Sequence, residues 1–185
     1  MAPARALIVL ALLLAGCREE ERASGPPPAA AAPPALSGSG VGCLRIGAPL
    51  AALPPGCRIV ADRVVPGAEG MQERRVDVIV GSDTVIATIV ADSVWRLAVT
   101  APTLRTGDGL GPGTPAAELL RQAGSRIIGG EGRLFVVAPR HCGLSFELGS
   151  LPRELLAVPP DRVASRLPPG TAISRVLVFG CAGST

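Results

Sequence analysis

The chain has 185 residues, with 18 basic and 15 acidic side chains and a formal net charge of +3, and every basic side chain other than the one His is Arg. It contains three Phe, one Trp and no Tyr, so it lacks the aromatic platforms on which single-stranded nucleic acids usually stack. The charges are scattered and do not form the basic face that nucleic-acid binding requires, which argues against a nucleic-acid partner.

Residues 1–16 have the layout of an export signal, because Arg5 precedes the apolar run Ala6–Leu14. That run is shorter than the roughly 20 residues of a membrane-spanning helix. It leads into a motif that resembles the lipobox of bacterial lipoproteins, Leu14-Ala15-Gly16-Cys17. The resemblance implies that residues 1–16 are a signal peptide and that Cys17 becomes the lipidated first residue. The alternative is an ordinary signal peptide that happens to be followed by Cys17.

The resemblance also implies a cellular location. Lipoproteins carry two or three acyl chains such as palmitate on this cysteine, and two chains hold a protein stably on a bilayer. The residue after Cys17 is Arg18 and not Asp, which by the sorting rule of the family implies the outer membrane, with the protein facing the periplasm. The inner membrane and the cell surface remain alternatives.

Residues 17–40 are expected to form the lipidated cysteine and a disordered tether. Arg18–Gly40 is charged and then rich in Pro, Ala, Ser and Gly, a composition that cannot bury enough apolar surface to fold. A Pro-rich chain extends by about 3.1 Å per residue, so the tether would reach roughly 70 Å. We expect a passive spacer; a dedicated role in reaching away from the membrane is the alternative.

The rest of the chain contains an internal repeat, an indication of stacked copies of one unit. Leu44–Leu53 aligns with Leu110–Leu119. Four later pairs of segments align in the same order: Gly56–Val60 with Gly124–Ile128, Arg75–Val80 with Arg133–Ala138, Val85–Val90 with Gly143–Leu148, and Val94–Val99 with Ile173–Val178. We therefore predict repeat unit 1 at residues 41–105 and repeat unit 2 at residues 106–185, with an insertion at residues 149–172 that either carries a partner surface or simply covers the sheet.

Each unit is expected to be a short helix followed by a three-stranded antiparallel meander. Thr114 and Pro115 suit the start of the second helix and Gly124 its end. Residues 75–90 alternate like two strands around a Gly-Ser-Asp turn and predict a hairpin, and Val94–Thr100 predicts the third strand. The fold class expected is α+β, with the strands in one sheet or two and the helices over one face.

This layout resembles the tandem folds of the BamE/SmpA lipoproteins and of β-lactamase-inhibitor-like proteins. The stretch from Thr106 to Gly113 also resembles, loosely, the Thr-x-x-Gly-x-x-x-Gly motif of a stress-regulated envelope lipoprotein family of unknown function. These resemblances imply a protein of the bacterial envelope.

Four cysteines remain besides Cys17, and an even number in an exported chain suggests disulfides: Cys43, Cys57, Cys142 and Cys181. On the expected fold, Cys43 and Cys57 bracket the first helix. Cys142 precedes one strand and Cys181 follows another, so antiparallel pairing would bring them together. We therefore predict the disulfides Cys43–Cys57 and Cys142–Cys181.

No residues form a recognisable catalytic, cofactor or metal site. His141 and Cys142 are adjacent, so their side chains point apart and make a poor nucleophile-base pair. One His is too few for a usual zinc site, and Gly107–Gly113 lacks the Lys of a phosphate-binding loop. Asp108 and Glu118 are not placed across any predicted cleft. The pair Arg74-Arg75 suits an anionic partner, although a solvated strand edge is the simpler interpretation.

The sequence thus predicts a membrane-anchored periplasmic lipoprotein that acts as a non-catalytic protein-interaction module in envelope assembly or maintenance. Its partners would be the membrane, through the lipid on Cys17, and an unidentified envelope protein. A binder of a small molecule or lipid is the second hypothesis and an enzyme the third. A sizeable apolar cavity would favour the ligand binder, and an exposed apolar patch over a filled core would favour the partner module.

Overall fold

The computed structural model describes residues 35–67 and 70–181. The predicted signal peptide, Cys17 and most of the predicted tether lie outside these residues. The last residues of that predicted tether do have regular structure, since β1 (Leu36–Ser37) pairs with β2 (Gly40–Val41) and Leu36 is only 2 % exposed. The tether prediction was therefore too long at its C-terminal end. Across the described ranges, no helix has the length and apolar character needed to cross a bilayer.

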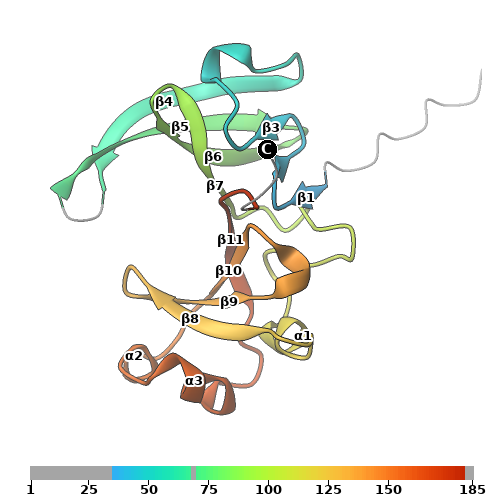
Figure 1. The fold of residues 1–185 in the computed structure, drawn as a ribbon, viewed down its shortest axis with the longest axis vertical. Helices are drawn as coiled ribbons and strands as arrows, with labels where there is room; N and C mark the ends of the chain where they lie inside the picture. Colours follow the sequence, from blue (N-terminus) through green and yellow to red (C-terminus); the bar gives the residue numbers. More distant parts are fainter. Residues whose placement is uncertain (1–34, 68–69, 182–185) are drawn as a thin grey trace, which may run out of the picture. The chain divides into compact units, whose positions relative to one another are not determined.

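One antiparallel sheet dominates the described part of the chain, with eight strands in the order β4-β5-β6-β7-β11-β10-β9-β8 (Figure 1). The first four form a meander: β4 (Cys57–Pro66), β5 (Gln72–Val80), β6 (Asp83–Val90) and β7 (Ser93–Val99). The last four form another: β8 (Arg126–Gly130), β9 (Arg133–Val137), β10 (Leu144–Leu148) and β11 (Ile173–Val178). The meanders join where β7 pairs with β11 and Val99 lies opposite Val176.

The predicted α+β fold of two helix-plus-three-strand repeats is wrong, because the structure is mostly β. The described residues form 11 strands, eight in the large sheet and three in a small one, β1-β2-β3 (Leu44–Arg45). They contain only three short α-helices: α1 (Ala116–Leu120), α2 (Arg153–Leu156) and α3 (Pro160–Val163).

The physical reason lies in the length of the apolar segments. The helix expected after Pro49 is a single 3-10 turn, Leu50–Ala52, because Pro54 follows too soon for a helix to repay its nucleation cost. The segment after it, Cys57–Pro66, forms a fourth strand in the first meander.

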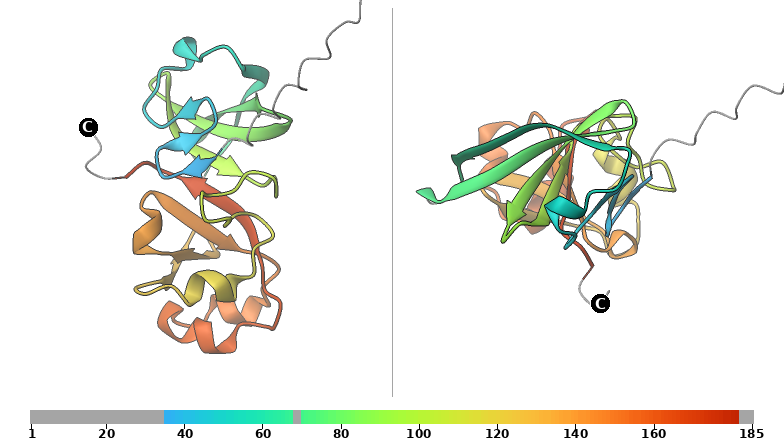
Figure 2. Two further views of the ribbon diagram at one scale, coloured as in Figure 1. Left: turned by 90° about the vertical axis from the view of Figure 1, so that its right-hand side faces the viewer. Right: turned by 90° about the horizontal axis from the view of Figure 1, so that it is seen from above.

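Alternation along the strands separates the two faces of the large sheet. On β5, Val76, Val78 and Val80 are buried while the residues between them point the other way. Figure 2 shows the small sheet and α1 in front of this buried face, which they help to cover. Leu36, Val41 and Leu44 of the small sheet and Leu119 of α1 join the strand residues in one apolar cluster. Leu104 and Leu110, from the segment between β7 and α1, belong to the same cluster.

The segment predicted as an insertion, residues 149–172, contains α2 and α3. Val163 of α3 is fully buried in the main core, and α3 packs beside β8. At least this part of the insertion therefore covers the sheet. Leu156 of α2 is one of the exposed large apolar residues.

Two disulfides are present among the described residues, and they join the pairs that the sequence predicts. Cys43–Cys57 ties the turn between β2 and β3 to the start of β4, with 5.9 Å between the Cα atoms. Cys142 precedes β10 and Cys181 follows β11. Leu144 at the start of β10 lies opposite Val178 at the end of β11, so the antiparallel pairing brings the two cysteines together, with 5.3 Å between their Cα atoms.

Candidate functional site

The face of the large sheet that points away from the core carries an arginine on each of four strands. These are Arg75 on β5, Arg96 on β7, Arg175 on β11 and Arg133 on β9, and together they line one hollow of about 200 Å³. We call this side of the sheet the arginine face. Each arginine neighbours a core residue in sequence, as strand alternation requires; Leu97, for example, is fully buried directly after Arg96.

Glu147 on β10 is the buried carboxylate of this face, with a side chain only 4 % exposed. Arg175, its neighbour across the strand pair, donates from Nε to Oε2 at 2.6 Å. Arg133 donates from Nη1 to the other carboxylate oxygen. A carboxylate this deeply buried needs hydrogen-bond partners, and the two guanidinium groups supply one to each of its oxygens.

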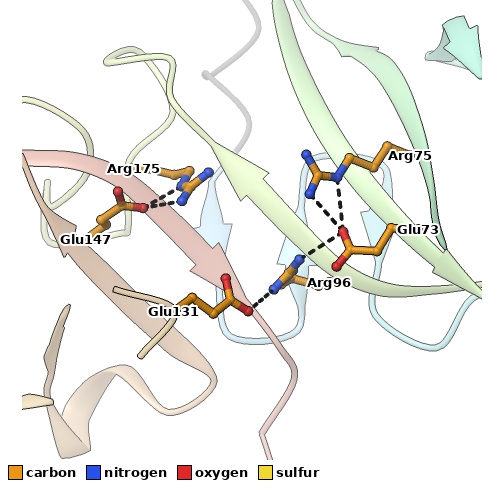
Figure 3. Close-up of polar contacts among 6 residues, drawn as sticks. All are labelled: Glu73, Arg75, Arg96, Glu131, Glu147 and Arg175. Carbon is orange, nitrogen blue, oxygen red and sulfur yellow. Dashed lines mark hydrogen bonds and ion pairs between the residues drawn. The ribbon is translucent and has the colours of Figure 1, made fainter. Parts of the chain in front are cut away.

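Arg96 lies at the centre of the arginine face and has the loosest contacts in the cluster. Its guanidinium nitrogens are 3.5 Å from Glu73 and 3.4 Å from Glu131 (Figure 3). Arg75 contacts the same Glu73 carboxylate at 2.9 Å, the distance expected of a charge-assisted hydrogen bond. The Arg96 side chain is nevertheless only 11 % exposed. The Arg96 guanidinium is therefore largely shielded from water, while its N–H donors make only long contacts to Glu73 and Glu131.

The curvature of the sheet contributes to this arrangement. Glu131 belongs to the tight turn between β8 and β9, where Glu131 and Gly132 have φ values of 51° and 68°. In the strand order, β11 and β10 separate β7 from β9, and three strand spacings amount to roughly 14 Å in a flat sheet. Because Glu131 nevertheless contacts Arg96 at 3.4 Å, the sheet must curve toward the arginine face between β7 and the β8–β9 turn.

Next to Arg96 the same face becomes aromatic. Trp95, Phe135 and Phe179 line a hollow of about 190 Å³ together with Arg96, Ile128, Gly129, Gly130, Glu131, Ser145 and Leu177. We call this hollow the aromatic pocket. The Trp95 and Phe179 rings meet edge to face at 6.1 Å, and the Arg96 guanidinium lies 5.3 Å from the Trp95 ring centre, within cation–π range.

The aromatic pocket and the arginine-lined hollow are contiguous, since Arg96, Glu131 and Leu177 line both. The polar part contains four arginines and three glutamates, which leaves one excess positive charge. These two adjoining hollows can together bind an anionic group beside an apolar or aromatic group.

The structure also settles where the sequence candidates lie. Cys142 is in a disulfide and so offers no thiolate. His141 instead lies 3.3 Å from Asp108, Nε2 to Oδ2, and edge to face with the Phe146 ring. The described residues contain no group of three or more His, Cys, Asp or Glu side chains that could hold a metal ion.

The pair Arg74-Arg75 is split by strand alternation. Arg74 points to the side opposite the arginine face and pairs with Asp62 and Asp92, whereas Arg75 joins the arginine face. Arg96, Arg133 and Arg175 were not singled out from the sequence. Each of these three arginines lies in a different strand beside β-forming residues, and this recurrence was the sequence signal that could have identified a shared arginine-bearing face.

Asp108 gives a testable pH dependence. Thr106 donates a hydrogen bond to its carboxylate, and this bond, with smaller help from the charges of His141 and Arg140, lowers the pKa of Asp108 below its ordinary value. A lowered pKa contributes stability above the unfolded value of about 3.9, and that stability is lost as the pH falls through the folded value. We expect Asp108→Asn to remove this contribution at neutral pH.

Urea unfolding of the wild type and Asp108→Asn at pH 6 and below pH 3 tests this expectation. The wild type should have a larger free energy of unfolding than Asp108→Asn at pH 6. This difference should stay below about 1 kcal/mol, because the carboxylate is partly exposed, and it should shrink below pH 3. A gap that is constant with pH would contradict it.

Comparisons with known proteins inform the fold. No protein family and no curated protein matches the sequence. Among solved structures, the fold is similar to the crystal structure of the uncharacterized protein yfeY from Escherichia coli, with a TM-score of 0.54 and 19 % sequence identity. The match covers 78 % of this chain and 98 % of that chain. At this identity the likeness concerns the fold alone.

Proposed function

We propose that this protein is a membrane-anchored lipoprotein of the bacterial envelope that acts without catalysis, by binding an envelope protein on its arginine face. The lipobox resemblance around Cys17 supports the anchor, and two disulfides support an oxidising compartment outside the cytosol. The outer membrane is the proposed address because Arg18 follows Cys17.

The observation that carries the proposal is the pair of exposed aromatic rings beside the arginines. Trp95 is 49 % exposed and Phe179 is 39 % exposed, in a chain with only one Trp and three Phe. Trp and Arg are the residue types most enriched where protein partners gain binding energy. Exposed apolar surface beside polar side chains is typical of an interaction site.

The buried core favours a partner module over a ligand held between helices and sheet. On its buried face the sheet packs tightly, and Val76, Leu97 and Val99 have no exposed surface. A small ligand is the second candidate, and the aromatic pocket, at about 190 Å³, is the observation that favours it.

Site-specific photo-cross-linking in intact cells that naturally produce the protein tests the proposal. A photoreactive phenylalanine analogue replaces Phe179 in the full-length chain, which keeps a ring at an exposed position. We expect irradiation to give a covalent adduct with one envelope protein, identified by mass spectrometry.

The matched control carries the same analogue at Leu156, which is exposed on α2 outside the arginine face. It should give no such adduct. If position 179 gives no adduct, or if both positions give the same one, the arginine face is not the partner surface.

A further inference from the structure

The floor of the aromatic pocket contains a glycine that the fold does not require. Gly130 lies at the end of β8 with no positive φ, so its backbone is open to any residue. A Cβ built on it would meet nothing closer than 3.8 Å, the edge of the Phe135 ring. Gly inside a strand weakens it, and often marks a place where a ligand or another chain approaches closely. The missing side chain keeps the pocket open.

The size of the aromatic pocket fits one ring. Its volume of about 190 Å³ compares with the roughly 150 Å³ of an apolar cavity that holds one benzene molecule. A long acyl chain would extend beyond it into water. The three rings that line it allow edge-to-face or offset contacts with a fourth.

A fourth ring in this pocket would have to come from another molecule. The chain has four large aromatic side chains: three of them, Trp95, Phe135 and Phe179, line the pocket, and Phe146 is fully buried in the core. No other segment of the same chain can supply a Phe, Tyr or Trp side chain.

The position of Arg96 adds a charge requirement. Arg96 borders the aromatic pocket and holds its two glutamates only at 3.4 and 3.5 Å. A carboxylate that arrives beside the bound ring can take up these donors in a shorter, stronger contact. In an extended peptide, residues i and i+2 point to the same side about 7 Å apart, so one peptide can present a ring and a carboxylate together.

We propose that the aromatic pocket binds an extended peptide segment of a partner protein, which inserts an aromatic side chain over Gly130 and places an Asp or Glu carboxylate on Arg96. This inference rests on the proposed function and specifies the chemistry of the partner. Gly107 supplies a control, since it lines neither the aromatic pocket nor the arginine-lined hollow, has no positive φ, and a Cβ built on it would meet nothing within 4 Å.

The test is selection of a random seven-residue peptide library displayed on phage against the full mature chain held in phospholipid nanodiscs. We expect enrichment of an aromatic residue two positions from an Asp or Glu. A synthetic peptide of the enriched sequence, with Phe as its ring, should change the fluorescence of Trp95, the one tryptophan in the chain. Changing its acidic residue to the amide should weaken binding about 10- to 100-fold.

Three variants assign the result to the pocket. Gly130→Val fills the pocket and should abolish peptide binding, while urea unfolding shows stability equal to or above that of the wild type. Gly107→Val should bind like the wild type. Selection against Arg96→Gln should still enrich aromatic residues but lose the acidic preference.

Several results would overturn the inference. The first is a selection that yields no consensus peptide, and the second is a selection against Gly130→Val that yields the same consensus as the wild type. The third is self-association of the chain through this pocket. The fourth is a change in Trp95 fluorescence when laurate is added but not when any peptide is added. A cross-linked envelope partner at position 179 without a peptide consensus would leave the proposed function standing and remove this inference alone. Absence of any cross-linked partner would remove the proposed function itself.

Discussion

Replacing Cys142 and Cys181 together with serine is expected to lower the free energy of unfolding by about 4 kcal/mol, from the loop-closure entropy of the unfolded chain. The two cysteines are 39 positions apart, so the bridge restricts a long loop that contains β10, the insertion and β11. This is a large share of the 5–15 kcal/mol typical of a folded domain. Equilibrium urea unfolding, read by far-ultraviolet circular dichroism, measures the change.

The second disulfide provides the comparison. Cys43 and Cys57 are 14 positions apart, and the corresponding double serine variant should lose about 3 kcal/mol. If removing the Cys142–Cys181 bridge costs less than removing the shorter one, chain entropy is not its main contribution.

Replacing Glu147 with alanine is expected to cost about 2–3 kcal/mol, the scale of hydrogen bonds to charged groups. The substitution leaves Arg175 and Arg133 without their shared carboxylate and removes volume from a nearly closed part of the arginine face. Because Glu147 is buried, 1 M salt should reduce the difference only slightly. Urea unfolding at low and high salt provides the measurement.

Glu131→Ala is the matched control, because Glu131 is exposed and contacts Arg96 only at 3.4 Å. It should cost less than about 1 kcal/mol. Equal losses for Glu147→Ala and Glu131→Ala would contradict the structural role given to the buried carboxylate.

Local pattern was enough to predict three of the four strands of the first meander, and it missed β4. The hairpin expected over residues 75–90 matches β5 and β6, and the strand expected from Val94 matches β7, because each rests on period-two alternation and a polar turn. The helix expected after Pro49 is only a 3-10 turn, because a short apolar segment between prolines suits either structure. The helix expected after Thr114 and Pro115 is present as α1, but it ends at Leu120, before Gly124.

The arginine face could not be predicted, because it depends on the order of strands in the sheet. Arg96 and Arg175 are far apart in sequence and come together only because β7 pairs with β11. Arg74 and Arg75 look like one basic patch in the sequence, yet alternation places them on opposite faces. The disulfides were easier, since each pair flanks segments whose antiparallel or local pairing could be inferred.

The central claim is that a disulfide-linked binding domain works outside the cytosol while anchored through Cys17. Intact-mass and peptide mass spectrometry of the mature protein, extracted from washed membranes, tests it most directly. The account predicts a chain that begins at Cys17 and carries two or three acyl chains on that residue, and release of a Cys17→Ser variant from the membrane fraction. A mature chain without acyl groups that washes off membranes would contradict it.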